Sequence, residues 1–196
     1  MDSLQRTEVL LLFKYRIGLL LEVTHIDVKE VVMLRIVLVC VALLLVAGSI
    51  GAADRPVAPN GIAIYPDYMS WKVIAPSYRE DKGQIRIITG NETAVAALRA
   101  GKNPLPDGSV LAKVAWKAEK HPNFPVATEP GAFAQVEFMV KDAKKYKDTG
   151  GWGFARFVGN ELKPYGKDAN FVAECFGCHI PVAKNDYLFT KIVKTP

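Results

Sequence analysis

Two cysteines and a histidine near the C-terminus constrain this chain of 196 residues more than any other feature of its sequence. Cys175 and Cys178 lie three residues apart, and His179 follows directly. A disulfide between these cysteines would close only a very short loop and would add little stability. The third cysteine, Cys40, lies in a distant apolar run. The pair therefore calls for a chemical explanation, and the surrounding fold must present both thiols from one short segment.

The segment Glu174-Cys-Phe-Gly-Cys-His179 has the Cys-x-x-Cys-His pattern of c-type haem attachment. Two thiols at this spacing lie on one face of a helical turn, from which both reach the vinyl groups of a porphyrin. The neutral imidazole of His179 would bind the iron from the same side. A zinc site would need two more ligands, and past the apolar N-terminal region only His121 remains as a further histidine or cysteine. The pattern predicts one covalent haem c.

The charge distribution argues against a nucleic-acid partner. The formal net charge is +5, from 25 basic and 20 acidic residues, and the lysines are spread along the chain. A nucleic-acid footprint needs basic residues gathered on one face. The first fifty or so residues are strongly apolar, whereas the rest is mixed and turn-rich. That remainder is long enough to bury the core of one domain without disulfides.

Residues 33–53 have the pattern of a signal peptide. Met33-Leu-Arg35 provides a charged start, residues 36–46 an apolar run, and residues 47–53 the small residues of a cleavage site. The apolar run is shorter than the roughly 20 residues that a membrane-spanning helix needs. We therefore expect a periplasmic protein. Residues 1–32 are either a mis-called start before Met33, or part of a longer signal or an uncleaved membrane anchor.

The exported part predicts a single α+β domain with a mainly antiparallel sheet and a few short packed helices. Residues 54–64 are predicted to form an extended lead-in, and residues 65–196 the haem domain. Alternating apolar residues indicate strands, and Asn91 and Gly101 are suited to cap and end a helix. We expect strands over 73–75, 84–89, 109–117, 132–140 and 152–158, helices over 66–71, 92–100 and 173–180, a helical turn over 141–147, a loop over 121–131 and an extended segment over 187–193.

The ligand opposite His179 would separate two classes of haem protein. A methionine or histidine there would give a closed electron-transfer cytochrome. The candidates are Met69, Met139 and His121. Small electron-transfer cytochromes are usually all-helical with an N-terminal attachment motif, whereas this motif follows a predicted sheet. We therefore expect a five-coordinate iron that is open to small molecules.

An ordered set of short segments over residues 65–193 resembles the cytochrome P-460 family of lysine-crosslinked c-type haem proteins, which is related to cytochrome c′-beta. The segments are Tyr68-Met-Ser-Trp71, Gln84-Ile-Arg86, Asp107-Gly-Ser-Val-Leu-Ala-Lys113, Glu137-Phe-Met-Val-Lys-Asp142, Trp152-Gly-Phe154, Glu174-Cys-Phe-Gly-Cys-His179 and Asp186-Tyr-Leu-Phe-Thr190. Each segment alone is a weak signal, but the ordered set is specific. The resemblance implies an antiparallel sheet with packed helices, and a homodimer.

The resemblance also implies roles for individual residues. Lys113 would bond through its side-chain nitrogen to a meso carbon of the porphyrin, and Glu137 would be a distal general base whose pKa burial raises. Arg86 would position the haem, while Trp152 and Phe154 would line its pocket. The alternatives are a solvent-facing Lys113, a surface or salt-bridged Glu137, and purely structural roles for the other three.

Three functions remain open from the sequence. The first is a hydroxylamine oxidoreductase that passes electrons to a redox partner such as a soluble cytochrome c. The second is a protein that binds nitric oxide without turnover, like cytochrome c′-beta. The third is plain electron transfer with Met69 or Met139 as the sixth ligand. The presence of Lys113 favours the enzyme.

Overall fold

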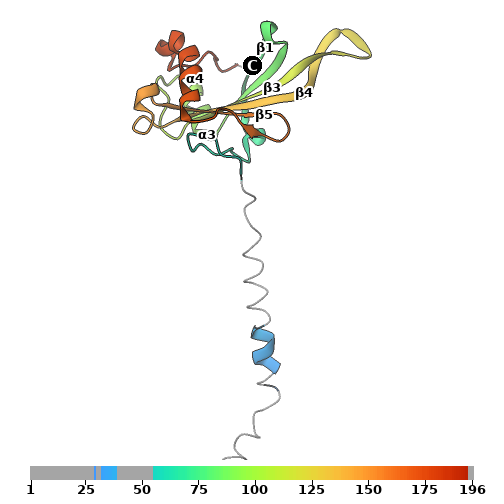
Figure 1. The fold of residues 1–196 in the computed structure, drawn as a ribbon, viewed down its shortest axis with the longest axis vertical. Helices are drawn as coiled ribbons and strands as arrows, with labels where there is room; N and C mark the ends of the chain where they lie inside the picture. The colour runs from blue at the N-terminus through green and yellow to red at the C-terminus, as the bar shows by residue number, and fades with distance from the viewer. Residues whose placement is uncertain (1–28, 30–31, 39–54, 194–196) are drawn as a thin grey trace, which may run out of the picture. The chain divides into compact units, whose positions relative to one another are not determined.

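The computed structural model describes Lys29, residues 32–38 and residues 55–193 (Figure 1). The chain divides into two units after Asp54. In the first unit residues 32–38 are helical, and the expectations for residues 1–32 and 33–53 fall mainly outside the described residues. In the described part of the chain, no helix combines the length and the apolar character needed to cross a membrane.

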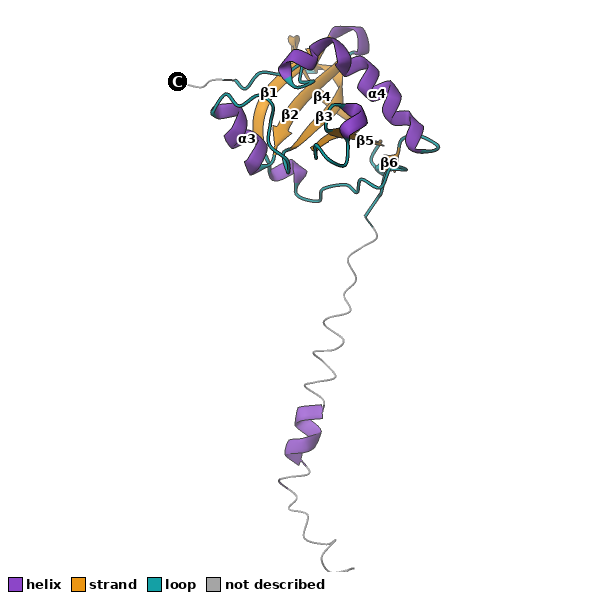
Figure 2. Ribbon diagram, turned by 90° about the vertical axis from the view of Figure 1, so that its left-hand side faces the viewer, coloured by secondary structure: helices purple, strands orange, loops and turns teal. Residues whose placement is uncertain are grey.

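The second unit is built on a six-stranded antiparallel sheet in which each strand pairs with the next along the chain (Figure 2). The strands are β1 (Lys72–Arg79), β2 (Gln84–Gly90), β3 (Val110–His121), β4 (Phe124–Lys141), β5 (Trp152–Val158) and β6 (Lys163–Pro164). The expectation of an α+β domain with a mainly antiparallel sheet is thus confirmed, and β5 has the expected bounds.

Short helices connect and cover the strands. The α-helices are α3 (Glu92–Arg99) and α4 (Val172–His179), and the 3-10 helices are η2 (Tyr68–Ser70), η3 (Glu80–Lys82), η4 (Lys147–Thr149), η5 (Ala169–Phe171) and η6 (Ile180–Asn185). The side chain of Asn91 accepts a hydrogen bond from the backbone of Ala94 and caps α3, as its sequence predicts. Figure 2 shows α3 beside β1 and β2, and α4 beside β5.

Successive side chains of a strand point to opposite faces of the sheet, so the strands place apolar residues on both faces. Other parts of the domain cover each face. On one face Val114, Val136 and Phe138 form a first core with the buried residues of segment 58–71. On the other face Leu111 and Phe154 belong to a second core, which residues of α3 and segment 187–192 complete. The second face also carries the candidate site.

Residues 55–64 turn back on themselves instead of running straight as a lead-in. Val57 and Ala63 form an isolated antiparallel bridge around the turn. Ala58, Ile62 and Ile64 are buried in the first core. These apolar residues cover a sheet face that would otherwise be exposed to water, which is the physical reason for the turn.

The expectation of a loop over residues 121–131 is wrong. Strands β3 and β4 continue through this region and form a long hairpin that projects from the domain (Figure 1). The residues Pro130 and Gly131 suggested a loop, but the register shifts between the pairs Trp116–Phe133 and Ala118–Pro130. This irregularity absorbs the extra residues and lets the pairing resume beyond it.

Candidate functional site

Helix α4 presents the two cysteines and the histidine from one short segment. Cys175 is half-buried and packs against both cores, Cys178 is exposed, and both thiols are free. Residues three and four apart on a helix lie on the same face. His179, at the end of α4, therefore follows the two thiols around one turn, as the spacing predicts. Burial raises the pKa of the Cys175 thiol, with nearby Arg156 opposing the shift.

The imidazole of His179 is held in a defined orientation. Its Nδ1 lies 2.7 Å from the backbone oxygen of Tyr187. Because a carbonyl can only accept, Nδ1 carries the hydrogen and Nε2 keeps its lone pair for a metal. The rings of Phe154 and Phe189 lie 5.3 Å and 5.0 Å from the His179 ring. Burial lowers the pKa of His179, which keeps the imidazole neutral, although the Tyr187 carbonyl opposes this effect.

Three charged residues form a row across neighbouring strands, which we call the charged ladder: Lys113 on β3, Glu137 on β4 and Arg156 on β5. Lys113 and Glu137 are register partners, as are Glu137 and Arg156. Side chains of such partners project from the same face about 5 Å apart. Arg156 Nε donates to Glu137 Oε1 at 2.7 Å, and Lys113 Nζ forms an ion pair with Glu137 Oε2.

Glu137 is largely shielded from water, with its side chain 16% exposed, and its two cationic partners favour the charged carboxylate. Burial by itself raises the pKa of its carboxyl, but the contacts with Lys113 and Arg156 outweigh burial and lower the pKa below the ordinary value of 4.5. Burial acts on this pKa in the direction that the sequence predicts, but the net shift is downward, because the prediction did not include the two cations on the neighbouring strands.

Arg156 joins the charged ladder to α4. Its Nη1 lies 3.7 Å from Glu174 Oε1, and its guanidinium lies 4.3 Å from the centre of the Tyr165 ring. Tyr165 donates its hydroxyl hydrogen to Glu174 Oε2 at 2.9 Å. Sequence reasoning missed Arg156. Alternation along β5 could have identified it, because Arg156 falls on the same face as Phe154.

The charged ladder lies in the same region as Cys175 and His179. The charges of Lys113 and Glu137 act on both the His179 imidazole and the Cys175 thiol. Arg156 acts on the same thiol. Sequence positions more than 60 residues apart are thus brought together by the pairing of β3, β4 and β5 and the packing of α4 on β5.

The remaining predicted site residues differ in their surroundings, and Arg86 lies close enough to the charged ladder for Glu137 and Arg156 to act on its charge. Arg86 is buried, its guanidinium is hydrogen-bonded to Gln84 Oε1 at 2.7 and 3.2 Å, and burial lowers its pKa. Phe154 lies between the rings of His179 and Phe176. Trp152 is completely buried in the second core, with Lys141 Nζ 4.8 Å from its ring centre. Trp152 therefore supports the core rather than the surface around His179.

The candidate sixth ligands lie in different surroundings. Met69 is exposed on η2, whose neighbouring Tyr68 packs on Phe138 of the first core. Met139 packs against the second core. His121 lies on the projecting hairpin, where its Nε2 is 3.8 Å from Glu129.

These residues fit a covalently attached haem. The site offers two free thiols, an imidazole with an available Nε2, and two aromatic rings against that imidazole. Arg86 is a buried cation paired with an amide rather than a carboxylate, which suits the propionate of a haem. Residues 55–193 and the described residues before them contain no group of three or more His, Cys, Asp or Glu side chains able to hold a metal ion.

Comparison with known protein families agrees with the fit of the site to a haem. The sequence model described as Cytochrome P460 matches residues 65–190, a range that includes the charged ladder, both cysteines and His179. A search of curated proteins finds no match. The chain belongs to the cytochrome P460 family of haem proteins.

Proposed function

We propose that this protein is a periplasmic, mono-haem c-type oxidoreductase that oxidises hydroxylamine or a similar small nitrogen compound. Cys175 and Cys178 would hold the haem through thioether bonds, and His179 would bind the iron through Nε2. The observation that carries the proposal is the carboxylate of Glu137, held between Lys113 and Arg156 on a strand beside β5, on which α4 packs. An ionised carboxylate held by fixed partners can accept protons from a bound substrate.

The chain's own side chains would act on substrate protons and on the position of the haem. The haem, when bound, would supply the iron that binds the substrate nitrogen and accepts its electrons. Glu137 would take up protons, while Arg156 would keep its Oε1 in place through their 2.7 Å hydrogen bond. Arg86 would pair with a propionate. Phe154 and Phe189 would limit water around His179.

Lys113 connects the proposed crosslink with the proposed base. Its Nζ now forms an ion pair with Glu137 Oε2. If Lys113 Nζ replaces the hydrogen of a porphyrin meso carbon, with release of protons and transfer of two electrons to an oxidant such as a peroxide, its nitrogen ceases to be an ammonium, and Glu137 Oε2 loses its cation. That oxygen would then be free to accept a substrate proton, and the pKa of Glu137 would rise because one of the charges that lowers it is gone.

The proposal includes partners that follow from this chemistry. Electrons that leave the substrate must pass to an acceptor, for which a soluble cytochrome c is suited. The protein is expected to act as a homodimer after export.

Glu137→Gln tests the role of the base. The variant keeps the size of the side chain but cannot take up a proton, so we expect normal haem content and a fall in hydroxylamine turnover of about 100-fold or more. Steady-state kinetics of the purified holoprotein with an artificial acceptor measure this. Glu129→Gln, an exposed carboxylate on the hairpin, is the matched control. Unchanged turnover in Glu137→Gln would remove Glu137 from the mechanism.

A nitric-oxide-binding protein without turnover is the second candidate. Both oxygens of Glu137 are engaged by cations, so the free carboxylate oxygen that catalysis requires depends on release of Lys113. Mass spectrometry and absorption spectra distinguish the two functions. A crosslinked peptide that contains Lys113, with a red-shifted ferrous band, supports the enzyme. An uncrosslinked haem with high-spin iron, nitric-oxide binding and no turnover supports the binding protein.

A further inference from the structure

The segment that follows α4 has an unusual backbone. η6 ends at Asn185, and the next two residues, Asp186 and Tyr187, have φ angles of +49° and +63°. Residues other than glycine rarely adopt this left-handed region, because the Cβ atom approaches the backbone closely. Such a conformation persists only where surrounding contacts impose it, and it is found preferentially at functional sites.

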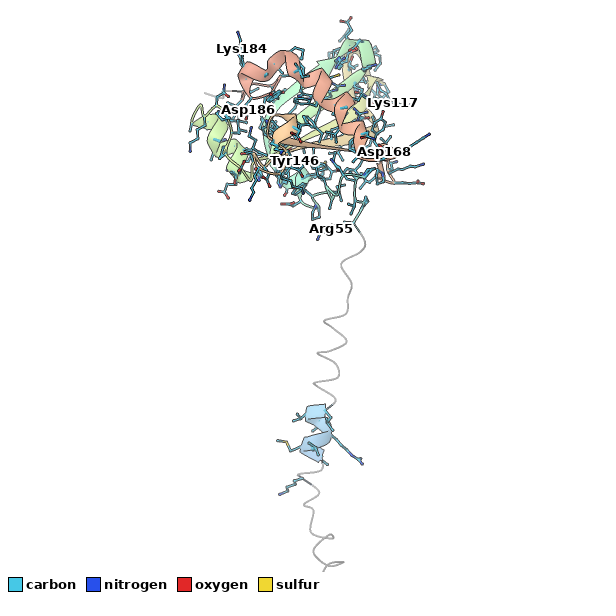
Figure 3. The ribbon with its side chains drawn as sticks, turned by 60° about the vertical axis from the view of Figure 1, so that its left-hand side comes forward. Arg55, Lys117, Tyr146, Asp168, Lys184 and Asp186 are labelled. Atoms are coloured by element: carbon cyan, nitrogen blue, oxygen red, sulfur yellow. The ribbon has the colours of Figure 1, made fainter. Side chains whose placement is uncertain are left out.

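A buried ion pair imposes the conformation at Asp186. Its Oδ1 lies 2.6 Å from Lys141 Nζ on β4, and its Oδ2 accepts a hydrogen bond from the backbone of Leu105 at 2.8 Å. The side chains of Asp186 and Lys141 are only 5% and 6% exposed. Figure 3 shows the contrast with Lys184, which projects from the surface two residues earlier, whereas Asp186 lies within the domain.

Tyr187, which directly follows Asp186, contacts His179 through its backbone. The backbone oxygen of Tyr187 is the group 2.7 Å from His179 Nδ1. The Tyr187 ring is confined as well, because it packs against Phe176 and occupies the space where a side chain at Gly150 would lie. The position of the Tyr187 carbonyl is thus fixed by contacts on both sides of the peptide.

Stability alone does not account for the ion pair. Two charges removed from water lose much of their hydration, and apolar residues of similar volume often stabilise a fold equally well. Lys141 and Asp186 also lie outside the charged ladder, so they have no part in the proposed proton transfer. Their geometry connects instead to His179.

We propose that Lys141 and Asp186 are positioning residues that hold the Tyr187 carbonyl on Nδ1 of His179 and thereby set the donor strength of the imidazole towards iron. This inference rests on the proposed role of His179 as the iron ligand. A firm hydrogen bond from Nδ1 to a carbonyl makes the imidazole more basic. A more basic ligand stabilises ferric over ferrous iron and lowers the reduction potential.

The double variant Lys141→Met, Asp186→Asn tests the proposal in the haem-loaded protein. It removes both charges together and leaves no unpaired buried ion. Asparagine tolerates the left-handed backbone and keeps an oxygen for the Leu105 amide. We expect the iron–histidine stretching band in the resonance Raman spectrum of the ferrous protein to shift to lower frequency and the reduction potential to rise, with haem content unchanged.

Asn91→Ala is the matched control, because it removes a half-buried cap on α3 whose hydrogen-bond partners are Ala94, Gly108 and Val110. It should leave the band and the potential at wild-type values. The inference is overturned if the folded double variant keeps the wild-type band and potential. The inference is also overturned if the iron–histidine stretching band of the wild-type protein has the frequency expected for an imidazole without a hydrogen bond. This measurement uses the wild-type protein alone, so it does not depend on whether a variant folds.

The same spectra separate this inference from the proposed function. Absence of any iron–histidine band would contradict the role of His179 as ligand. A normal band that responds to the double variant, in a protein that does not oxidise hydroxylamine, would support the positioning role and contradict the proposed enzyme.

Discussion

Glu137 illustrates how neighbouring strands decide the chemistry of a single side chain. The resemblance to the cytochrome P460 family implies a carboxylate beside the haem site, and the structure adds Lys113 and Arg156 on either side. These cations reverse the direction in which burial shifts its pKa. A sequence without known strand register cannot supply this information, since both partners come from other strands.

The lowered pKa of Glu137 predicts a pH-dependent contribution to stability. Its folded pKa lies below its unfolded one, so its ion pairs stabilise the fold fully above about pH 4.5, and this contribution is lost as the pH falls through the folded pKa. The difference in free energy of unfolding between wild type and Glu137→Gln should therefore be largest at neutral pH and shrink on acidification. Urea unfolding from pH 7 to pH 3 measures it.

Glu129→Gln serves as the control in this series, because its carboxylate is exposed on the hairpin and surface pairs contribute little. A difference for Glu137→Gln that stays constant over the whole pH range would contradict the lowered pKa.

At the scale of the elements, the sequence predicts those helices and strands that interactions between nearby residues determine. Strand β5 follows from its richness in aromatic residues, and α3 from Asn91 and Gly101. The hairpin beyond Trp116 was missed, because Pro130 and Gly131 resemble loop residues until the partner strand is known. The cysteines and His179 were found because their chemistry lies within a single turn, whereas Arg156 depends on the sheet register.

Asn91 joins α3 to β3, and its loss should weaken both. Its side-chain oxygen accepts from the backbones of Ala94 and Val110, and its amide donates to Gly108. We expect Asn91→Ala to lower the free energy of unfolding by roughly 1–2 kcal/mol, as for other N-cap losses. Chemical denaturation measures the loss. Asn91→Asp, which keeps the accepting oxygen, should recover most of it, and equal losses in both variants would contradict the capping role.

At the scale of the whole molecule, coverage of both sheet faces decides which residues the domain needs. The second face carries the haem site and is closed by α3, α4 and segment 187–192. The first face is closed by segment 58–71. The family match begins at residue 65, yet three of the buried residues of the first core precede it. Composition alone suggested a Pro-rich lead-in, because nothing local shows which face such a segment covers.

A chain that begins at Tyr65 should therefore be much less stable than one that begins at Arg55. It lacks Ala58, Ile62 and Ile64, and full burial of an isoleucine is worth about 1.5–3 kcal/mol. It also loses the hydrogen bond from the Asn60 amide to the Phe154 carbonyl, 2.8 Å long. We expect a loss of roughly 4 kcal/mol in the free energy of unfolding by urea denaturation.

Within the longer chain, Ile62→Ala should be destabilising and Val57→Ala, at a half-exposed position, nearly neutral. Equal stability of the two chains would show that residues 65–193 close the first core unaided, and the turn at residues 57–63 would then have no part in holding the face opposite the haem site.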